Sequence, residues 1–233
     1  FSIIILSDRD VSSKMAAIPA LLATSGLHHH LISQGTRTKV SLVVETGEAR
    51  ELHHFAVLIG YGANAVNPYL AFESIEFMIQ DGRFEEPLHF KDAEKNFLKA
   101  CHKGLYKVIS KMGISTIQSY CGAQIFEAVG LGNELIEKYF TATPSRIGGI
   151  DLKTVAQEAL KRHEIGFPSI PSTDKMLDIG GDYHWRREGE FHQLNPQSIA
   201  LLQHSVRSAD YKIFKIYAKG VNEQNKNLAN IRG

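Results

Sequence analysis

Short β-branched apolar runs alternate with longer segments of helical periodicity, and this alternation constrains the fold more than any other feature. Residues 2–6 and 39–45 are largely apolar, and the first run is followed at once by Ser-Asp-Arg-Asp. Strands that are apolar on both faces are typical of a parallel sheet that is covered by helices. The alternation therefore predicts an α/β fold of parallel strand–helix units.

Four strand–helix units are expected within residues 1–150. Strands are predicted at residues 2–6, 39–45, 63–67 and 114–120. Helices are predicted at residues 16–33, 48–60, 70–80, 92–112, 124–129 and 134–140. Residues 141–149 are expected to form a loop. Because parallel strands are joined through helices, these units predict a partial, barrel-like domain.

The pattern changes after residue 150. Helices are predicted at residues 152–163, 196–206 and 209–221, with an irregular segment at 166–189. Asn195-Pro196 favours a helix start, because asparagine caps helices and proline suits their first turn. We therefore divide the chain into an α/β core at 1–150, a helical and irregular extension at 151–221, and a linker at 222–233.

Charge and cysteine content exclude several classes of protein. The net charge is only +1, which directs the chain neither to nucleic acid nor to an anionic membrane. The apolar run at residues 3–6 is far shorter than the roughly 20 residues that span a bilayer. Cys101 and Cys121 are too few for a disulfide scaffold or for the three or four thiolates of an iron–sulfur cluster. We expect a reduced compartment, the cytoplasm or a plastid stroma.

Polar residues lie at the ends of the predicted strands, which is where the active-site residues of parallel barrels are located. These candidates are Asp8, Arg9, Glu45, Asn67 and Cys121. Glu45 has the chemistry of a general base, and the helix start near Glu48 and Arg50 suits an anion. The simpler interpretation is that the two glutamates cap a helix and pair with Arg50 or Arg37.

Two histidine clusters, residues 28–30 and the pair His53 and His54, raise the question of a metal site. Consecutive helical residues point about 100° apart, so neither cluster converges on one ion. Helical zinc pairs use positions four residues apart instead. A metal would need one histidine from each cluster, with Glu45 as a third ligand. Packing and hydrogen bonding are the simpler roles.

Cys121 and Arg146 are weaker candidates. A thiol near a helix start has a lowered pKa and suits a nucleophile, but no histidine partner for Cys121 is identified. A small buried residue in a tight turn is the simpler interpretation. Arg146 stands in Ser-Arg-Ile-Gly-Gly, where an arginine fork and close backbone approach suit an oxyanion. A structural turn with Arg146 in an interface salt bridge fits equally well.

Four collinear stretches resemble the large subunit of glutamate synthase, in its pyridine-nucleotide- or ferredoxin-dependent forms. They are IPALLATSGLHHHLISQGTRTKVSLVVETGEARELHHFAVLIGYGANAVNPYLAFE, KGLYKVISKMGISTIQSYCGAQIFEAVGL, SRIGGIDL and GEFHQLNPQSIALLQHSVRSADYKIFKIYAKGVNE. The resemblance runs from Ile5 to about Glu223. It is more specific than any single motif above.

The resemblance implies the later part of the family's central domain, an α/β domain without flavin that links the glutaminase and FMN synthase domains. It implies a role in the ammonia path of an enzyme that makes glutamate from glutamine and 2-oxoglutarate. The FMN and 3Fe-4S cluster of that enzyme would lie elsewhere. Its partners would be the remaining domains, with a reductase subunit or ferredoxin. The non-catalytic contact residues would be Asp8, Arg9, Glu45, Glu48, Arg50, His53, His54, Asn67, Cys121 and Arg146.

The residues taken by themselves allow two other interpretations. One is a self-sufficient barrel enzyme that uses Glu45, His53 or His54, and Cys121 with a flavin or a metal. The other is an oligomerisation module. The start at Phe1, directly inside an apolar run, predicts a piece of a longer polypeptide and favours the central-domain interpretation.

Overall fold

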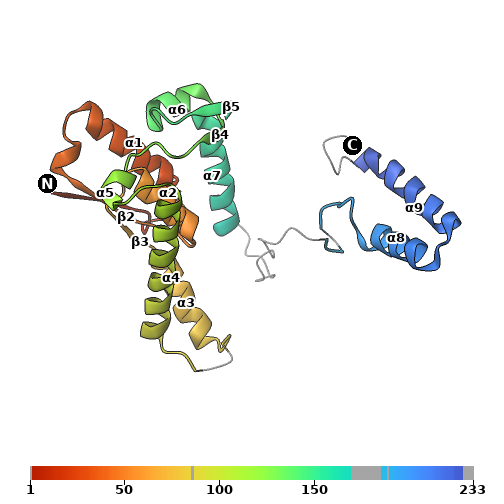
Figure 1. The fold of residues 1–233 in the computed structure, drawn as a ribbon. Helices are drawn as coiled ribbons and strands as arrows, with labels where there is room; N and C mark the ends of the chain where they lie inside the picture. The colour runs from red at the N-terminus through yellow and green to blue at the C-terminus, as the bar shows by residue number, and fades with distance from the viewer. Residues whose placement is uncertain (1, 85–86, 169–184, 188, 228–233) are drawn as a thin grey trace. The chain divides into compact units, whose positions relative to one another are not determined.

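The structure is a computed structural model that describes residues 2–84, 87–168, 185–187 and 189–227 (Figure 1). The chain divides into two compact units, Phe1–Pro171 and Ser172–Gly233, and each is described by itself. No helix within the described ranges is both long enough and apolar enough to cross a membrane. The predicted irregular segment at 166–189 lies largely outside the described residues.

A parallel sheet organises the first unit. Strands β1 (Ile3–Ser7), β2 (Ser41–Glu45) and β3 (Ala65–Asn67) pair in the order β1-β2-β3. The register places Ser7 beside Glu45 and Glu45 beside Asn67. The carboxyl ends of the strands therefore meet at one edge, and the first three predicted strands are confirmed.

Two helices, α1 (Ala20–Ser33) and α2 (Leu52–Gly60), pack against this sheet. They cover the face that carries Leu42 and Val44, which are almost fully buried. Ile3 and Ile5 belong to the opposite face, because side chains alternate along a strand. These two residues are 58% and 62% exposed, so the described elements leave that face largely uncovered.

A second core lies beyond α2. The short 3-10 helix η1 (Arg37–Lys39) precedes β2, and α3 (Tyr69–Gln80) follows β3. The long helix α4 (Phe90–Lys111) packs on α2 and α3 and buries Leu105 and Ile109. Tyr120, at the end of the one-turn helix α5 (Ile117–Tyr120), completes this cluster.

The strand predicted at residues 114–120 is wrong. Its β-branched sequence forms α5 instead, because the Thr116 hydroxyl accepts a hydrogen bond from the Ser119 N–H at 3.2 Å and caps the turn. The ring of Tyr120 then enters the core, with no exposed surface. Burial of a large aromatic side chain therefore outweighs the local preference for strand.

A second, two-stranded parallel sheet forms where a helix at 124–129 and a loop at 141–149 were predicted. It consists of β4 (Ala128–Leu131) and β5 (Ser145–Ile150), and these two predictions are wrong. Gln124 has a left-handed φ of 54°, which breaks the helix before it forms. A Cβ at Gly149 would overlap the backbone of Gly130, so the glycines allow the two strands to approach.

Helices α6 (Asn133–Tyr139) and α7 (Leu152–Gly166) follow these two strands and confirm the helices predicted there. The α6 residues Leu135 and Ile136 join Phe140 in a third apolar cluster, against which Leu21 and Leu22 of α1 pack. The described strands form two separate parallel sheets and no closed barrel. The predicted α/β class with parallel strand–helix units is confirmed.

The second unit is a pair of helices. Helix α8 (Pro196–Ser208) packs on α9 (Tyr211–Glu223), and the 3-10 helix η2 (Gln224–Asn227) follows within the predicted linker. The Asn195 side chain accepts from the Ser198 N–H, and the Ser198 hydroxyl accepts from the Asn195 N–H, each at 3.0 Å. This capping box confirms the predicted start of α8.

Candidate functional site

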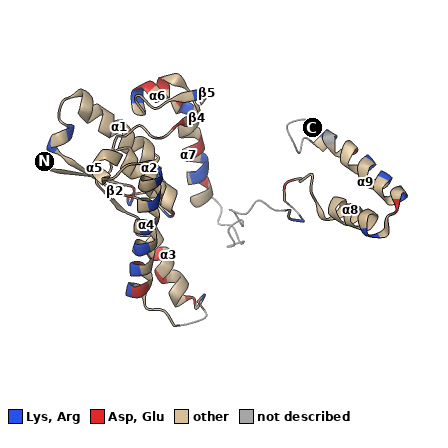
Figure 2. Cartoon of the chain, viewed as in Figure 1, with Lys and Arg blue, Asp and Glu red and all other residues tan. Residues whose placement is uncertain are grey.

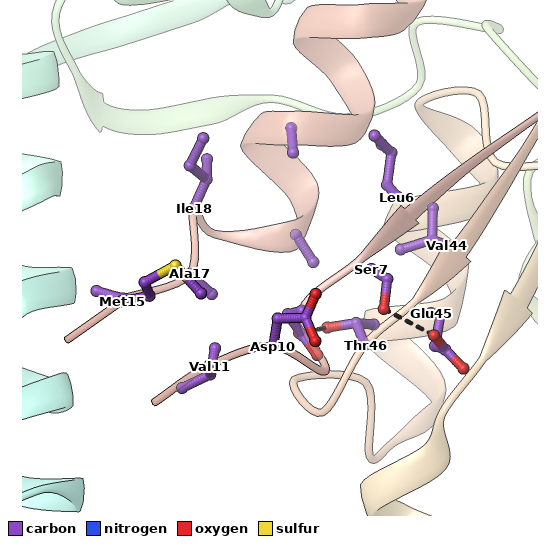
Figure 3. A pocket seen from close by; sticks show the side chains of 14 residues that line it. Leu6, Ser7, Asp10, Val11, Met15, Ala17, Ile18, Val44, Glu45 and Thr46 are labelled. Atoms are coloured by element: carbon purple, nitrogen blue, oxygen red, sulfur yellow. Dashed lines mark hydrogen bonds between the residues drawn. The ribbon is translucent and has the colours of Figure 1, made fainter. Parts of the chain in front are cut away.

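Glu45 is the centre of a polar cluster at the carboxyl edge of the three-stranded sheet. Its carboxylate accepts hydrogen bonds from the Ser7 hydroxyl at 2.7 Å, from Arg9 Nε at 2.8 Å and from Asn67 Nδ2 at 3.1 Å. Figure 3 shows the contact between Ser7 and Glu45. The bonds from Ser7 and Arg9 lower the pKa of Glu45, so the carboxylate stays ionised. A carboxylate held in this way is a poor general base.

The Arg9 side chain makes three contacts with neighbouring elements. Its Nη1 lies 3.3 Å from Oε1 of Glu73, and its guanidinium carbon lies 4.1 Å from the centre of the Tyr69 ring. The salt bridge between Arg9 and Glu45 is the third contact. Arg9 therefore ties β1, β2 and α3 together at the edge of the sheet, as a planar guanidinium with several donors does well.

Asp8 closes the loop that follows β2. It accepts from the Thr46 hydroxyl at 2.5 Å and from the Gly47 N–H at 3.1 Å. Burial, and then a hydrogen bond to Asp8, raise the pKa of Tyr69 to about 12. Tyr69 therefore keeps its proton at neutral pH, and both side chains act as fixed hydrogen-bonding groups.

A pocket of about 300 Å³ adjoins this cluster. Met15 and Ile18 lie on one side of it, and Leu6 and Val44 lie on the other (Figure 3). Its lining is mainly apolar, with Asp8, Asp10, Glu45 and the hydroxyls of Ser7 and Thr46 among the polar groups. Of these, Asp8, Glu45, Ser7 and Thr46 already hydrogen-bond to protein groups. Because these polar groups are already engaged, the pocket is suited to apolar contact and not to proton transfer.

Glu48 and Arg50 lie before the observed start of α2, which begins at Leu52 rather than at residue 48. Glu48 Oε2 accepts from the Ala20 N–H at 2.7 Å, so this carboxylate stabilises the N-terminus of α1. The Arg50 backbone N–H donates to His54 Nδ1 at 3.1 Å. The glutamate does cap a helix, although not the one that follows it in sequence.

His53 and His54 have different neighbours. The His53 ring meets Phe126 edge-on, with 6.4 Å between the ring centres. His54 Nε2 lies 3.5 Å from Oε1 of Glu51. Among the described residues, no group of three or more histidine, cysteine, aspartate or glutamate side chains is arranged to hold a metal ion.

Cys121 lies at the other edge of the sheet from Glu45. It follows helix α5 rather than a strand, and the next residue donates its N–H to the Gly60 carbonyl at 2.8 Å. Gly60 ends α2, and a crossover helix between parallel strands ends at their amino edge. Burial also raises the pKa of the Cys121 thiol, which disfavours the nucleophilic thiolate.

Arg146 is separate from all of these residues. It lies in β5 with a largely exposed side chain, and its Nε is 3.5 Å from Oε1 of Glu127. The structure thus brings Asp8, Arg9, Glu45 and Asn67 together at one edge of the sheet. It does not bring Cys121 to this edge.

A buried network around His28 was missed from the sequence. His28 Nδ1 accepts from Arg37 Nε at 2.9 Å, and Arg37 Nη2 donates to the Gly62 carbonyl at 2.8 Å. Arg37 Nη1 also donates to the Val40 carbonyl at 2.8 Å. Burial, and then the charge of Arg37, lower the pKa of His28 to about 4. The histidine run was the only signal, and it does not distinguish the buried member.

His28 makes the stability of the first unit depend on pH. The folded state holds the His28 pKa near 4 against an ordinary 6.5, so the unfolded chain binds more protons between these values. The free energy of unfolding should therefore fall as the pH drops from 6.5 to 4, by about 1–2 kcal/mol after allowance for solvent screening. Urea unfolding at several pH values measures this.

The matched control is His30, an exposed residue of the same cluster. We expect His28→Gln to reduce the pH dependence in this window, with a remainder from His29, whose pKa burial also lowers. We expect His30→Gln to leave the pH dependence as in the wild type. Equal slopes for both variants would contradict the assignment to His28.

Comparison with known proteins places this arrangement in context. The model of the family described as glutamate synthase central domain matches residues 1–132. The chain is 50% identical over 223 residues to the glutamate synthase [NADPH] large chain of Bacillus subtilis, covering 96% of this chain and 14% of the relative.

Two further relatives are similar over almost the same range. The glutamate synthase [NADH] of Saccharomyces cerevisiae is 42% identical over 225 residues, which are 93% of this chain and 10% of the relative. The ferredoxin-dependent glutamate synthase of Cyanidium caldarium is 41% identical over 225 residues, with 92% and 14% covered. The chain thus spans at most 14% of the length of these three relatives.

Proposed function

The chain belongs to the glutamate synthase central-domain family, and we propose that it serves there as a non-catalytic connecting domain. It links the glutaminase and FMN synthase domains of an enzyme that transfers the amide nitrogen of glutamine to 2-oxoglutarate, giving two glutamates. The enzyme as a whole acts in the cytoplasm or a plastid stroma, with a reductase subunit or ferredoxin as electron donor.

The state of the strand-end polar groups is the observation that carries this proposal. Glu45 accepts three hydrogen bonds, and Asp8 accepts from Thr46 and Gly47. A catalytic base or nucleophile needs a free lone pair that faces the substrate. Groups that satisfy one another instead stiffen the edge of the sheet, which suits a domain that positions its neighbours.

The uncovered face of the sheet supports a connecting role. Ile3 and Ile5 are more than half exposed, and patches of exposed apolar surface commonly mark contacts with other protein. We place a neighbouring domain on this face. The polar groups of Ser7 and Glu45 belong to this same face, at its carboxyl edge. They would then border the boundary between domains, where they help shape the ammonia path.

The cofactors of the whole enzyme belong to other parts of it. A 3Fe-4S cluster needs at least three thiolates, and this chain has only Cys101 and Cys121. The alternative of a self-sufficient barrel enzyme lacks support, because Glu45 and Cys121 lie at opposite edges of the sheet. No step of the reaction is therefore assigned to this chain's own residues.

The purified chain provides the first test. We expect no visible flavin absorption, no glutaminase activity and no 2-oxoglutarate-dependent oxidation of NADPH, with the Bacillus subtilis large chain and its reductase as positive control. Turnover by the 233-residue chain, or a stoichiometric flavin, would overturn the proposal.

A chimaera tests the connecting role itself. This chain replaces the matched segment of the Bacillus subtilis large chain, and the ratio of glutamine consumed to glutamate formed is measured. We expect the ratio to stay coupled, as in the parent. Substituting Ile3 and Ile5 with aspartate in the chimaera should uncouple it, with glutamine hydrolysed without synthesis. A coupled ratio in that variant would contradict a domain contact at this face.

A further inference from the structure

Lysines recur at every fourth position along helix α4. All six have exposed side chains: Lys91, Lys95, Lys99, Lys103, Lys107 and Lys111. Helical residues four apart are neighbours on successive turns. Each step of four residues also turns about 40° around the axis, so the lysines form a row that winds gradually around the helix, which we call the lysine stripe. Figure 2 marks in blue the lysine and arginine positions along α4.

The charge of this helix is not balanced locally. Six lysines against two carboxylates, Asp92 and Glu94, give α4 a formal charge of +4, whereas the whole chain carries +1. In the described part of the chain, no α4 lysine takes part in an ion pair. Like charges four residues apart destabilise a helix, so helix stability does not account for the stripe.

The first four lysines of the stripe share an exposed face of α4 with other side chains. Lys91, Lys95, Lys99 and Lys103 lie on this face together with Glu94, Leu98, His102 and Tyr106. Leu98 is 38% exposed and Tyr106 is 60% exposed, so apolar surface lies between the charges. A tyrosine and a leucine flanked by charged residues are typical of a protein contact surface.

We propose that the lysine stripe docks a carboxylate-rich surface of a separate protein. Complementary charge raises the rate at which two proteins meet and fixes their orientation. A stable contact between domains of one polypeptide is more apolar at its core, where lysine is depleted. The uncovered sheet face around Ile3 and Ile5 is apolar in this way. The lysine stripe is not, and it suits a reversible contact with another protein.

The structure disfavours a membrane as the occupant. An amphipathic helix that lies on a bilayer inserts its apolar face into the lipid. The apolar face of α4, with Ala93, Leu105 and Ile109, is already buried against its own domain. Nucleic acid is also disfavoured, since the stripe has no arginine and the rest of the chain carries a formal charge of −3.

An acidic helical peptide tests the proposal on the intact chain. The probe is a fluorescein-labelled peptide as long as α4, with glutamate at every fourth position, and its anisotropy reports binding. We expect binding at 0.01 M salt and its loss at 1 M, because the Debye length shrinks from about 30 to about 3 Å.

Two charge-matched variants locate the contact. The variant K91Q/K95Q/K99Q/K103Q should weaken binding at least about tenfold, as four modest surface ion pairs together allow. The control K14Q/K39Q/K153Q/K161Q removes the same charge from exposed lysines elsewhere and should stay within about twofold of wild type. Circular dichroism verifies that both fold, and Leu98→Glu, which puts a negative charge on the same face of α4, should also weaken binding of the acidic peptide.

Three results would overturn the proposal. The first is no binding of the peptide at low salt, and the second is an equal loss in the two charge-matched variants. The third is tighter binding of a single-stranded RNA oligomer or of anionic phosphatidylserine vesicles, lost in the stripe variant. That last outcome would assign the stripe to nucleic acid or to membrane instead.

Discussion

Replacing Tyr120 with alanine is expected to lower the free energy of unfolding of the first unit by about 3–5 kcal/mol. The side chain is fully buried, and it packs with Ala56, Leu105 and Ile109 where α2, α4 and α5 meet. Truncation to a methyl group removes these contacts and leaves a cavity that rigid helices cannot close. Urea unfolding followed by far-UV circular dichroism measures the loss.

The matched control keeps the ring and removes only the hydroxyl. The Tyr120 hydroxyl donates to the Ala56 carbonyl at 2.9 Å, and Tyr120→Phe should therefore cost only about 0.5–1.5 kcal/mol. Hydrogen exchange at the amides of α2 and α4 should accelerate much more in the alanine variant. Equal losses in the two variants would show that the hydroxyl, and not the ring, holds this core together.

Gly62→Ala is expected to cost about 3 kcal/mol or more, from two separate causes. Gly62 has a φ of 115°, a backbone conformation that an L-residue with a Cβ rarely adopts. The new methyl group would also overlap Nδ1 of His28 and lie 2.6 Å from its Cγ. His28 cannot yield easily, because Arg37 holds its ring. Thermal and urea unfolding measure the effect.

Gly113 separates the two causes. It also has a positive φ, of 71°, but no atom lies within 4 Å of a Cβ built there. Gly113→Ala should therefore cost only the backbone strain, about 1–2 kcal/mol. In addition, the double variant H28A/G62A should lose less than the sum of its single variants, because the overlap is gone. Strict additivity would contradict the steric argument.

The three strands of the first sheet and the strand-end cluster were predictable because they depend on local patterns. Apolar runs at residues 2–6 and 39–45 that alternate with helical segments favour parallel strands, and parallel register brings their ends together. Asp8, Glu45 and Asn67 therefore had to meet once the sheet formed. Helix starts with a strong local signal, such as Asn195-Pro196, were predicted for the same reason.

The wrong predictions lie where distant contacts compete with local preference. Residues 114–120 have a strand-like sequence, yet Tyr120 is buried only if this segment turns as a helix. The pairing of β4 with β5 depends on the close approach of Gly130 and Gly149, which no short window contains. Local propensity is weak compared with the burial of a large side chain or the formation of a strand pair.

The sequence by itself determined the α/β class, the three strands of the first sheet, the family, and the positions of Asp8, Arg9, Glu45 and Asn67 at the carboxyl edge of that sheet. Only the tertiary structure decided what those residues do. It joined Glu45 to Ser7, Arg9 and Asn67, turned Glu48 toward α1, and put Cys121 at the opposite edge. The physical reason is that a side chain's protonation and reactivity depend on its burial and hydrogen-bond partners, which the folded chain assembles from distant positions.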